Sequence, residues 1–176
     1  MRATLVIGII AALSAAASPQ ARAAGANRPV VLVFETAKGE GADSELAAST
    51  TRALRTYLRE TKRVESTIFD RESPTVLRAI MEQALTPDQV ASYSSRAQRL
   101  RVAKVLSYRY AAGAEITLRD SNVKVKLWVG QVDGGRRGSW EAVGSASAGA
   151  AGDRDRENAM QSAASTAVRE LSLIHI

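Results

Sequence analysis

The chain has 176 residues, of which 45% are hydrophobic, 24% are charged and 5% are aromatic, and its formal net charge is +6. This length suits one domain that buries a core without disulfides. The absence of cysteine excludes disulfide frameworks, thiolate zinc sites, iron–sulfur clusters and thiol nucleophiles. The single histidine, His175, disfavours histidine-rich metal sites and a Ser-His-Asp arrangement. We therefore expect a non-enzymatic protein without catalytic residues, a metal site or a cofactor.

Residues 1–23 have the pattern of a secretory signal peptide. Arg2 supplies a charged start, residues 5–13 are apolar, and Ala21-Arg22-Ala23 gives a small-x-small cleavage pattern. The alternative is an uncleaved membrane anchor, but the uncharged stretch is short for a span of roughly 20 residues and is diluted by alanine and serine. We expect cleavage and a periplasmic or secreted product that does not span a membrane. Loss of Arg2 and Arg22 lowers the formal charge from +6 to +4.

The last six residues, 171–176, translate a transposon end that is widely used in sequencing libraries. The alternative is a natural helix tail, because Leu171 fits the helical periodicity that precedes it. We expect the segment to be foreign to the natural protein, so that His175 carries no functional weight and the natural chain continues beyond Glu170. The predicted domain is then residues 24–170.

The first half of this domain alternates strands with helices. Residues 30–34 are a continuous apolar, β-branched run, which is typical of a strand buried on both faces. Asp43 or Ser44 can cap the next helix, and Ser73-Pro74 starts another with serine as the cap and proline at the first helical position. Thr86 with Gln89 repeats a start signal for a further helix. The predicted elements are strands at 30–34 and 64–69, and helices at 44–60, 74–84 and 87–100.

The second half has the pattern of an antiparallel meander followed by a helix. Four valine or leucine residues at odd positions from 123 to 129 alternate with Lys124, Lys126 and Trp128, which predicts a strand with one wet face. Extended segments are also predicted at 104–110, 114–118 and 139–143, with turns at 119–122 and 133–136. The last helix, near 160–168, is rich in alanine and can approach a sheet closely. The order predicts one α/β sandwich with a mixed sheet: β-α-β-α-α, an antiparallel meander and a C-terminal helix.

Motifs for catalysis are missing from this pattern. The glycine-rich stretch 130–137 lacks the order of a phosphate-binding loop and lies between strands, so a hairpin turn explains it. Asp70 and Glu72, after the second strand, could place two carboxylates on a metal ion. The same two residues serve equally well as a strand exit and a lead into the Ser73-Pro74 cap. A metal-assisted hydrolase that uses Asp70 and Glu72 is therefore kept as an alternative hypothesis.

Basic residues provide a second alternative. They gather on one helix, at positions 96, 99, 101 and 104, and on the meander. Trp128 lies on the lysine face of its strand, where an aromatic ring could stack on a base or a sugar. The simpler interpretation is that lysines solvate the open face and Trp128 packs under the C-terminal helix. A charge of +4 permits a nucleic acid or acidic glycan partner without requiring one. The candidate binding residues are Lys124, Lys126, Trp128, Arg136 and Arg137.

The meander also carries a family resemblance. Residues 122–133, followed by Gly134-Gly135-Arg136 and Ser139-Trp140, resemble the pattern of an alternating strand, Val-Asp, a glycine turn and tryptophan in bacterial envelope α/β domains. This group includes the N-terminal domain of TolB, the curli secretion protein CsgG and the penicillin-binding-protein activator LpoB. The first strand and the alanine-rich helix suit the group, so the resemblance spans residues 29–170.

The resemblance implies a fold similar to anticodon-binding domains and a role without catalysis. Such domains dock onto partner proteins, assemble into rings or precede a further domain. Two departures stand out: the chain has no lipidated cysteine, unlike CsgG and LpoB, and no long apolar hairpin that could build a pore. Our leading expectation is a secreted cell-envelope domain that acts through contact with an envelope protein, or through assembly with copies of itself.

Overall fold

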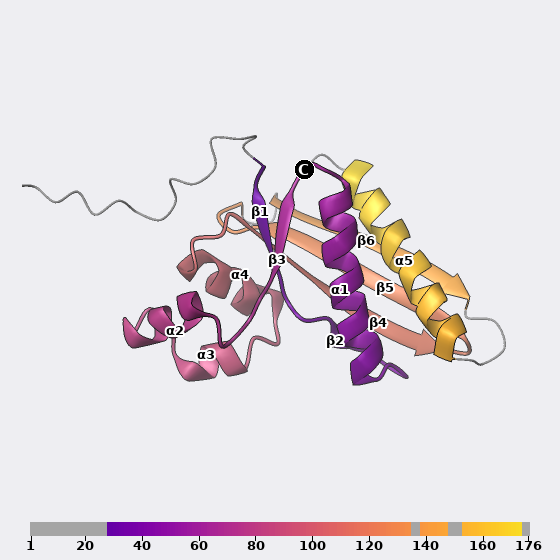
Figure 1. Cartoon of the computed structure of the whole chain (residues 1–176), viewed down its shortest axis with the longest axis horizontal. Coiled ribbons are helices and arrows are strands. Elements are labelled where there is room, and N and C mark those ends of the chain that lie inside the picture. Colours follow the sequence, from indigo (N-terminus) through magenta and orange to yellow (C-terminus); the bar gives the residue numbers. More distant parts are fainter. Residues whose placement is uncertain (1–27, 135–137, 148–152, 174–176) are drawn as a thin grey trace, which may run out of the picture.

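The computed structural model describes residues 28–134, 138–147 and 153–173, except the side chains of 153 and 171–173 (Figure 1). The elements follow the order that the sequence predicts, and the predicted fold class is confirmed. The strands are β1 (Val30–Val33), β2 (Ala37–Lys38), β3 (Glu65–Ile68), β4 (Tyr110–Arg119), β5 (Asn122–Gln131) and β6 (Ser139–Ser147). The helices are α1 (Ser44–Glu60), α2 (Pro74–Met81), α3 (Pro87–Ala91), α4 (Arg96–Val105) and α5 (Asp153–Leu173).

One mixed sheet contains all of these strands. Its main path is β3-β1-β4-β5-β6, and β2 pairs with β4 off this path. β1 runs parallel to both β3 and β4, whereas β4, β5 and β6 form an antiparallel meander. β2 was not predicted. It has two residues, and Ala37 and Lys38 pair with Glu115 and Ile116 of β4, so only a distant strand defines it.

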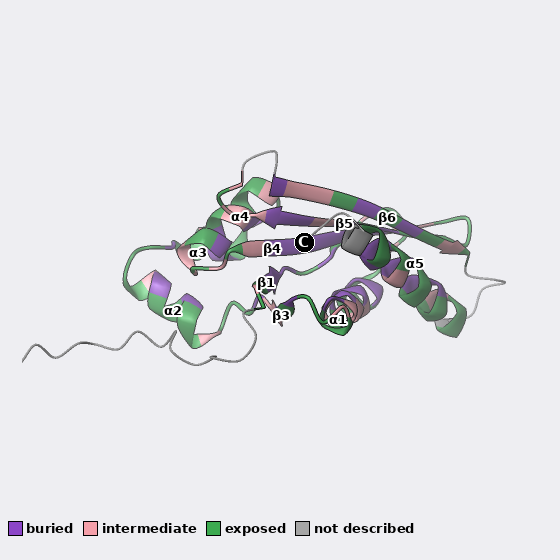
Figure 2. Ribbon diagram, turned by 90° about the horizontal axis from the view of Figure 1, so that it is seen from above, coloured by how far each residue is buried: buried purple, intermediate pink, exposed green. Residues whose placement is uncertain are grey.

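Helices cover the two faces of this sheet unequally. α1 and α5 lie side by side against one face, while α3 and α4 lie on the other (Figures 1 and 2). The α1/α5 side holds the larger hydrophobic core, and Val123, Val125, Leu127 and Val129 of β5 are fully buried in it. A second core, built around Phe34, lies beneath α2, α3 and α4. The alternation predicted for β5 is therefore confirmed.

The alanine-rich helix α5 packs unusually close to β6. Ala163, Ala164 and Ala167 are fully buried, and Gly144 of β6 faces them. A Cβ atom placed on Gly144 would lie 1.8 Å from the carbonyl oxygen of Ala163. Small side chains on the helix and a missing side chain on the strand together bring the two backbones into contact, as the composition of the helix predicted.

Two predicted boundaries around residue 100 are wrong. The single helix expected at 87–100 is two helices, because the chain leaves α3 at Ser92 and restarts at Ser95. The Ser95 side chain accepts from the Gln98 N–H while the Gln98 side chain accepts from the Ser95 N–H, which is a capping box. The extended segment expected at 104–110 is also wrong in its first part, since α4 continues to Val105 and β4 begins at Tyr110.

Several predictions fall on residues that the structure does not describe. The export signal at 1–23 and the loop at 149–152 lie outside the described residues. Of the six terminal residues, 171–173 end α5 and 174–176 lie outside. Within the described ranges, no helix combines the length and the apolar character needed to cross a bilayer.

Candidate interaction surface

The meander has one face that no helix covers along most of its length. We call this the open sheet face: the side chains of β4, β5 and β6 that project away from α1 and α5. Figure 2 shows exposed residues on the strands beyond the end of α4. Val143, in the middle of β6, is 39% exposed, which is high for a valine in a strand. The face comprises Glu115, Thr117, Arg119, Asn122, Lys124, Lys126, Glu141, Val143, Ser145 and Ser147.

Ion pairs of both signs organise the centre of this face. Glu141 accepts from Arg96 Nη1 at 2.9 Å and pairs with Lys126 Nζ at 3.5 Å. Arg96 also donates from Nη2 to the carbonyl oxygen of Val129 and lies over the ring of Trp128, 5.0 Å from its centroid. The Lys126 charge is therefore shared with a carboxylate, and these contacts fix Arg96 in place.

The remaining predicted binding residues are placed less closely together. Lys124 is exposed and sits in register between Thr117 of β4 and Ser145 of β6. Arg136 and Arg137 lie outside the described residues. Glu115 stands opposite Lys126 in the β4–β5 register, so acids and bases alternate across the face. The described part of the face is of mixed charge and is not a basic stripe.

Trp128 packs on the side of the sheet opposite to the one that the simpler interpretation assigned. It does not lie under the C-terminal helix: its ring belongs to the α2–α4 core, whereas α5 lies on the other face. The ring crosses Gly113, its register partner in β4, where a Cβ atom would come within 2.8 Å of Trp128 Cζ2. A glycine on β4 thus makes room for the indole.

Arg99 is the least expected feature beside this ring. The sequence groups it with the other basic residues of α4, yet its side chain and backbone together are only 7% exposed. Nε donates to the carbonyl oxygen of Tyr93 at 3.1 Å, and the guanidinium lies 5.9 Å from the ring centroid of Phe34. Burial lowers the pKa of Arg99, although an arginine remains charged at any physiological pH. It is a buried cation that the sequence gave no means to distinguish.

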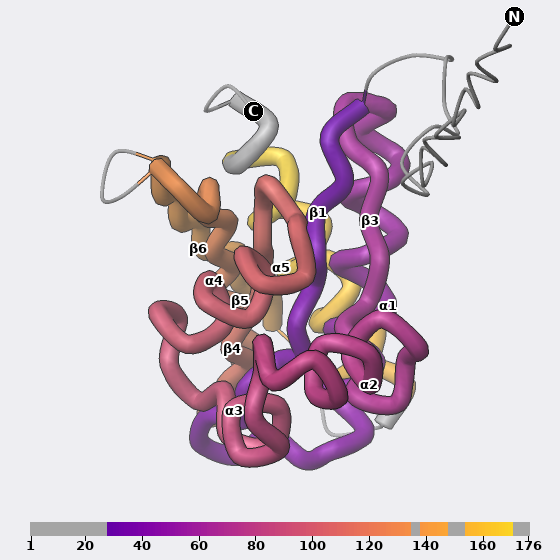
Figure 3. Tube along the Cα trace, turned by 90° about the vertical axis from the view of Figure 1, so that its left-hand side faces the viewer, coloured from indigo at the N-terminus to yellow at the C-terminus, as the bar shows by residue number. Residues whose placement is uncertain are grey.

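A small polar network lies beyond the carboxyl ends of β1 and β3. Tyr93 donates its hydroxyl to Glu35 Oε2 and accepts from Arg71 Nη2, both at 3.3 Å, and Arg71 pairs with Glu35 at 3.6 Å. Burial is the main cause that raises the pKa of Tyr93, and the Arg71 hydrogen bond opposes it. Figure 3 shows α2 and α3 beyond these strand ends. The chain leaves β1 towards α1 and β3 towards α2, on opposite faces, which is where open α/β sheets commonly bind ligands.

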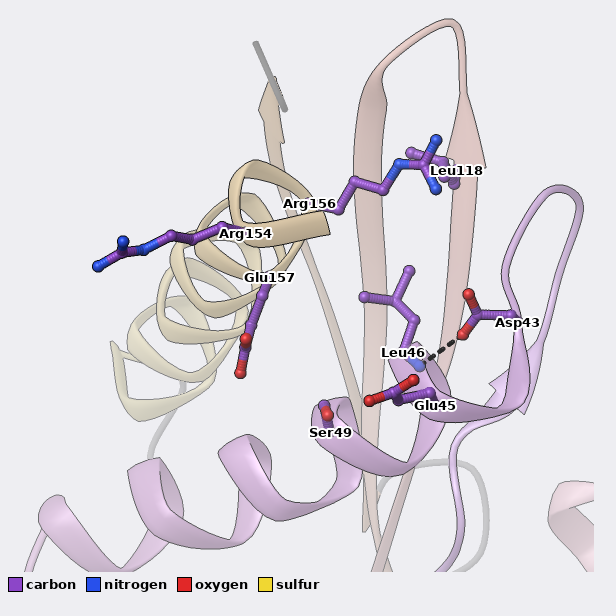
Figure 4. Close-up of a pocket in the computed structure, with 8 residues that line it drawn as sticks. All are labelled: Asp43, Glu45, Leu46, Ser49, Leu118, Arg154, Arg156 and Glu157. Atoms are coloured by element: carbon purple, nitrogen blue, oxygen red, sulfur yellow. Dashed lines mark hydrogen bonds between the residues drawn. The ribbon is translucent and has the colours of Figure 1, made fainter. Parts of the chain in front are cut away.

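Two hollows lie near the first turn of α1. One, of about 520 Å³, is bounded by Thr36, Ala47 and Ile68, with Lys38 and Arg52 at its rim. The other, of about 290 Å³, separates the first turns of α1 and α5 (Figure 4). In Figure 4, Asp43 accepts from the Leu46 N–H, and Arg156 extends towards Leu118 while Arg154 points away. Neither hollow gathers one kind of charge.

The metal hypothesis finds little geometry in the described residues. Asp70 Oδ1 accepts from the backbone N–H of Glu72 at 2.9 Å, which is the strand-exit turn that was the competing interpretation. No group of three or more histidine, cysteine, aspartate or glutamate side chains that could hold a metal ion occurs in the described ranges.

Comparison with known proteins shows the fold. The sequence matches no protein-family profile and no curated protein. The LpoB C-terminal domain from Salmonella enterica superposes with a TM-score of 0.52 at 16% identity, over 68% of this chain and 82% of that one. PelC from Paraburkholderia phytofirmans, solved as a dodecamer, has a TM-score of 0.53 at 16% identity, over 85% and 91%. The corresponding LpoB domain from Escherichia coli has a TM-score of 0.50 at 18% identity, over 68% and 82%.

The domain thus has an LpoB-like fold. The resemblance to LpoB that the meander suggested is confirmed at the level of fold, and the resemblances to TolB and CsgG remain predictions.

Proposed function

We propose that the chain is an exported, non-catalytic domain of the bacterial cell envelope that acts by binding other proteins. The open sheet face is the observation that carries this proposal. It presents an exposed valine among ion-paired and hydroxyl side chains, a mixture that suits a protein partner better than a polyanion. The secretory pattern of residues 1–23 supports export, and the LpoB-like fold supports the general class.

The edge beside this face strengthens the proposal. No described strand pairs with the outer edge of β6, which is nine residues long. Natural edge strands are commonly protected by lysine, proline or a short length, and β6 has none of these. An edge of this kind can accept a strand from another chain. PelC forms a dodecamer, so assembly with further copies of this chain belongs to the same proposal.

The test is site-specific photo-crosslinking in the natural host, with residues 1–23 retained. A photoreactive phenylalanine analogue replaces Val143 on the open sheet face or, as the control, the exposed Thr56 on α1. We expect a discrete cross-linked product from position 143 and none from position 56. A product of twice the chain mass indicates self-assembly, and any other discrete mass indicates a partner protein. Equal labelling from both positions, or none from either, would contradict the proposal.

The two alternatives keep their status as predictions. Polyanion binding through Lys124, Lys126, Trp128, Arg136 and Arg137 requires affinity that falls steeply with salt. The structure offers it one exposed lysine and one lysine shared with Glu141 among the described residues of that set.

A further inference from the structure

Arg99 is buried without an acid to balance it. Its only hydrogen bond within the described residues runs from Nε to the Tyr93 carbonyl oxygen, and none of the ion pairs there includes it. Glu35 is near enough to influence its pKa, but that carboxylate contacts Tyr93 and Arg71 instead. A buried charge without a partner destabilises a fold. The arrangement is therefore incomplete in the isolated chain.

The unused donors of Arg99 converge with a second unused donor. A Cβ atom on Gly113 would lie 2.6 Å from Arg99 Nη1 and 2.9 Å from Trp128 Cε2, the atom to which the indole Nε1 is bonded. Neither Arg99 Nη atom nor Trp128 Nε1 has an acceptor among the described residues. All three remain in contact with solvent, because Arg55 Nε is the one fully enclosed side-chain nitrogen or oxygen without a hydrogen bond in the described ranges.

We propose that the Arg99 guanidinium and the Trp128 indole N–H, converging over Gly113, bind a carboxylate of a protein partner that docks on the open sheet face. This inference rests on the function proposed above and names the chemistry of the partner's contact. A planar guanidinium beside an N–H presents parallel donors that match the two oxygens of a carboxylate. The carboxylate comes from an acidic side chain or from a chain terminus.

Charge balance favours a carboxylate over a phosphate. Glu141 already compensates Arg96, so Arg99 contributes one positive charge that is left over at this place. One carboxylate neutralises it. A phosphate group carries up to two negative charges and would face the carboxylates of Glu115 and Glu141 on the same surface. The site is therefore suited to a monoanion.

The test uses nuclear magnetic resonance on the ¹⁵N-labelled full chain. Four probes are titrated separately: the capped peptide acetyl-Gly-Asp-Gly-amide, its asparagine counterpart, acetyl-Gly-Gly-Gly with a free carboxyl terminus, and inorganic phosphate. The indole N–H of Trp128 is the reporter, and that of Trp140, which packs on the α1/α5 core, is the internal control. We expect a saturable shift of Trp128 alone with at least one carboxylate peptide, and at least tenfold weaker binding of the asparagine peptide.

The two carboxylate peptides distinguish a side chain from a terminus. An unmoved Trp128 with both of them would overturn the inference. Tighter binding of inorganic phosphate than of either peptide would also overturn it, in favour of a polyanion site.

Variants then assign the residues, with the Gly113 backbone amide as a reporter that every variant keeps. We expect about fivefold weaker peptide binding for Arg99→Lys, which loses the forked donor geometry, and a smaller loss for Trp128→Phe, which loses only the N–H. Arg101→Lys, at an exposed position on the same helix, should bind as the wild type does. The wild-type titrations stand by themselves if Arg99→Lys does not fold. Equal binding by Arg99→Lys and the wild type would refute the assignment.

The photo-crosslinking experiment separates this inference from the proposed function. If the peptides bind but position 143 captures no protein, the carboxylate site stands and the proposed function fails. If position 143 captures the same product in the wild type and in Arg99→Lys with equal yield, the proposed function stands and this inference fails.

Discussion

Substitution of Gly144 by alanine tests how closely α5 lies on the sheet. The new Cβ atom would start 1.8 Å from the Ala163 carbonyl oxygen and 2.9 Å from the Ala167 nitrogen, both of which belong to helix backbone that cannot rotate away. To reach even 3.0 Å, the shortest separation that real Cβ atoms tolerate, the helix must move by about 1.2 Å. Such a shift separates the fully buried Ala164 and Met160 from the strands beneath them.

The expected effect is large for the addition of one methyl group. Overpacking of a close-packed interior costs about 1 to 3 kcal/mol, and a clash with backbone belongs at the upper end. We therefore expect Gly144→Ala to lower the free energy of unfolding by about 3 kcal/mol, which corresponds to a fall in Tm of about 6 to 12 °C for a domain of this size. Urea unfolding of the full chain, followed by circular dichroism, measures the loss directly.

Gly130→Ala is the matched control. It is also a strand glycine, but a Cβ atom there would meet Leu100 Cδ2 at 3.0 Å, and the end of a leucine side chain can move. We expect its free energy of unfolding to stay within about 1 kcal/mol of the wild type, since alanine also reduces the entropy lost on folding. A loss below about 1 kcal/mol for Gly144→Ala, or a loss no greater than that of Gly130→Ala, would refute this account of the packing.

Three further predictions concern local features and use the same unfolding assay. Asp120 and Ser121, the β4–β5 turn, have φ angles of 47° and 63°, so Asn-Gly there should raise the free energy of unfolding by about 0.5 to 1 kcal/mol; a decrease would argue against this turn geometry. Ser95→Ala removes half of the α4 capping box and should cost about 1 kcal/mol; no loss would mean that the cap contributes nothing. Burial raises the pKa of Tyr93 in the folded state, so folding favours its neutral form. The resulting stability is fully present below the unfolded pKa of about 10 and is lost as pH rises through the folded value. Tyr93→Phe should therefore flatten the fall in stability between about pH 9 and 11, and an unchanged slope would refute the assignment.

Local signals in the sequence predicted most of the fold. Ser73 and Asp43 cap helices where expected, because a cap depends only on residues three positions away. The same kind of signal, Ser95 followed by Gln98, was available for α4 and would have divided the helix predicted at 87–100. β2 had no such signal, because two residues become a strand only through pairing with β4.

The candidate site depends on contacts that the sequence does not display. Lys126 and Trp128 are placed on one face by the alternation of β5, which could be predicted. Arg99 resembles Arg101, two positions away, in every local respect. Its burial arises because Gly113 of β4 leaves space beside Trp128 of β5, and these three residues meet only after the helix has docked on the meander. Non-local packing of this kind carries no periodic pattern.

The division of the core between two sheet faces has a consequence for the dynamics of the domain. α2 is held by buried Val76 and Ala79, and α3 by buried Val90, so residues 70–95 gain little from burial. Amide protons of this segment should exchange with solvent through local opening, whereas those of β4 and β5 should exchange only when the whole domain unfolds. The Tyr93 carbonyl oxygen that holds Arg99 belongs to the same segment. Occupation of the Arg99 site should therefore slow exchange in α3, which links a contact on the meander to the order of a helix on its far side.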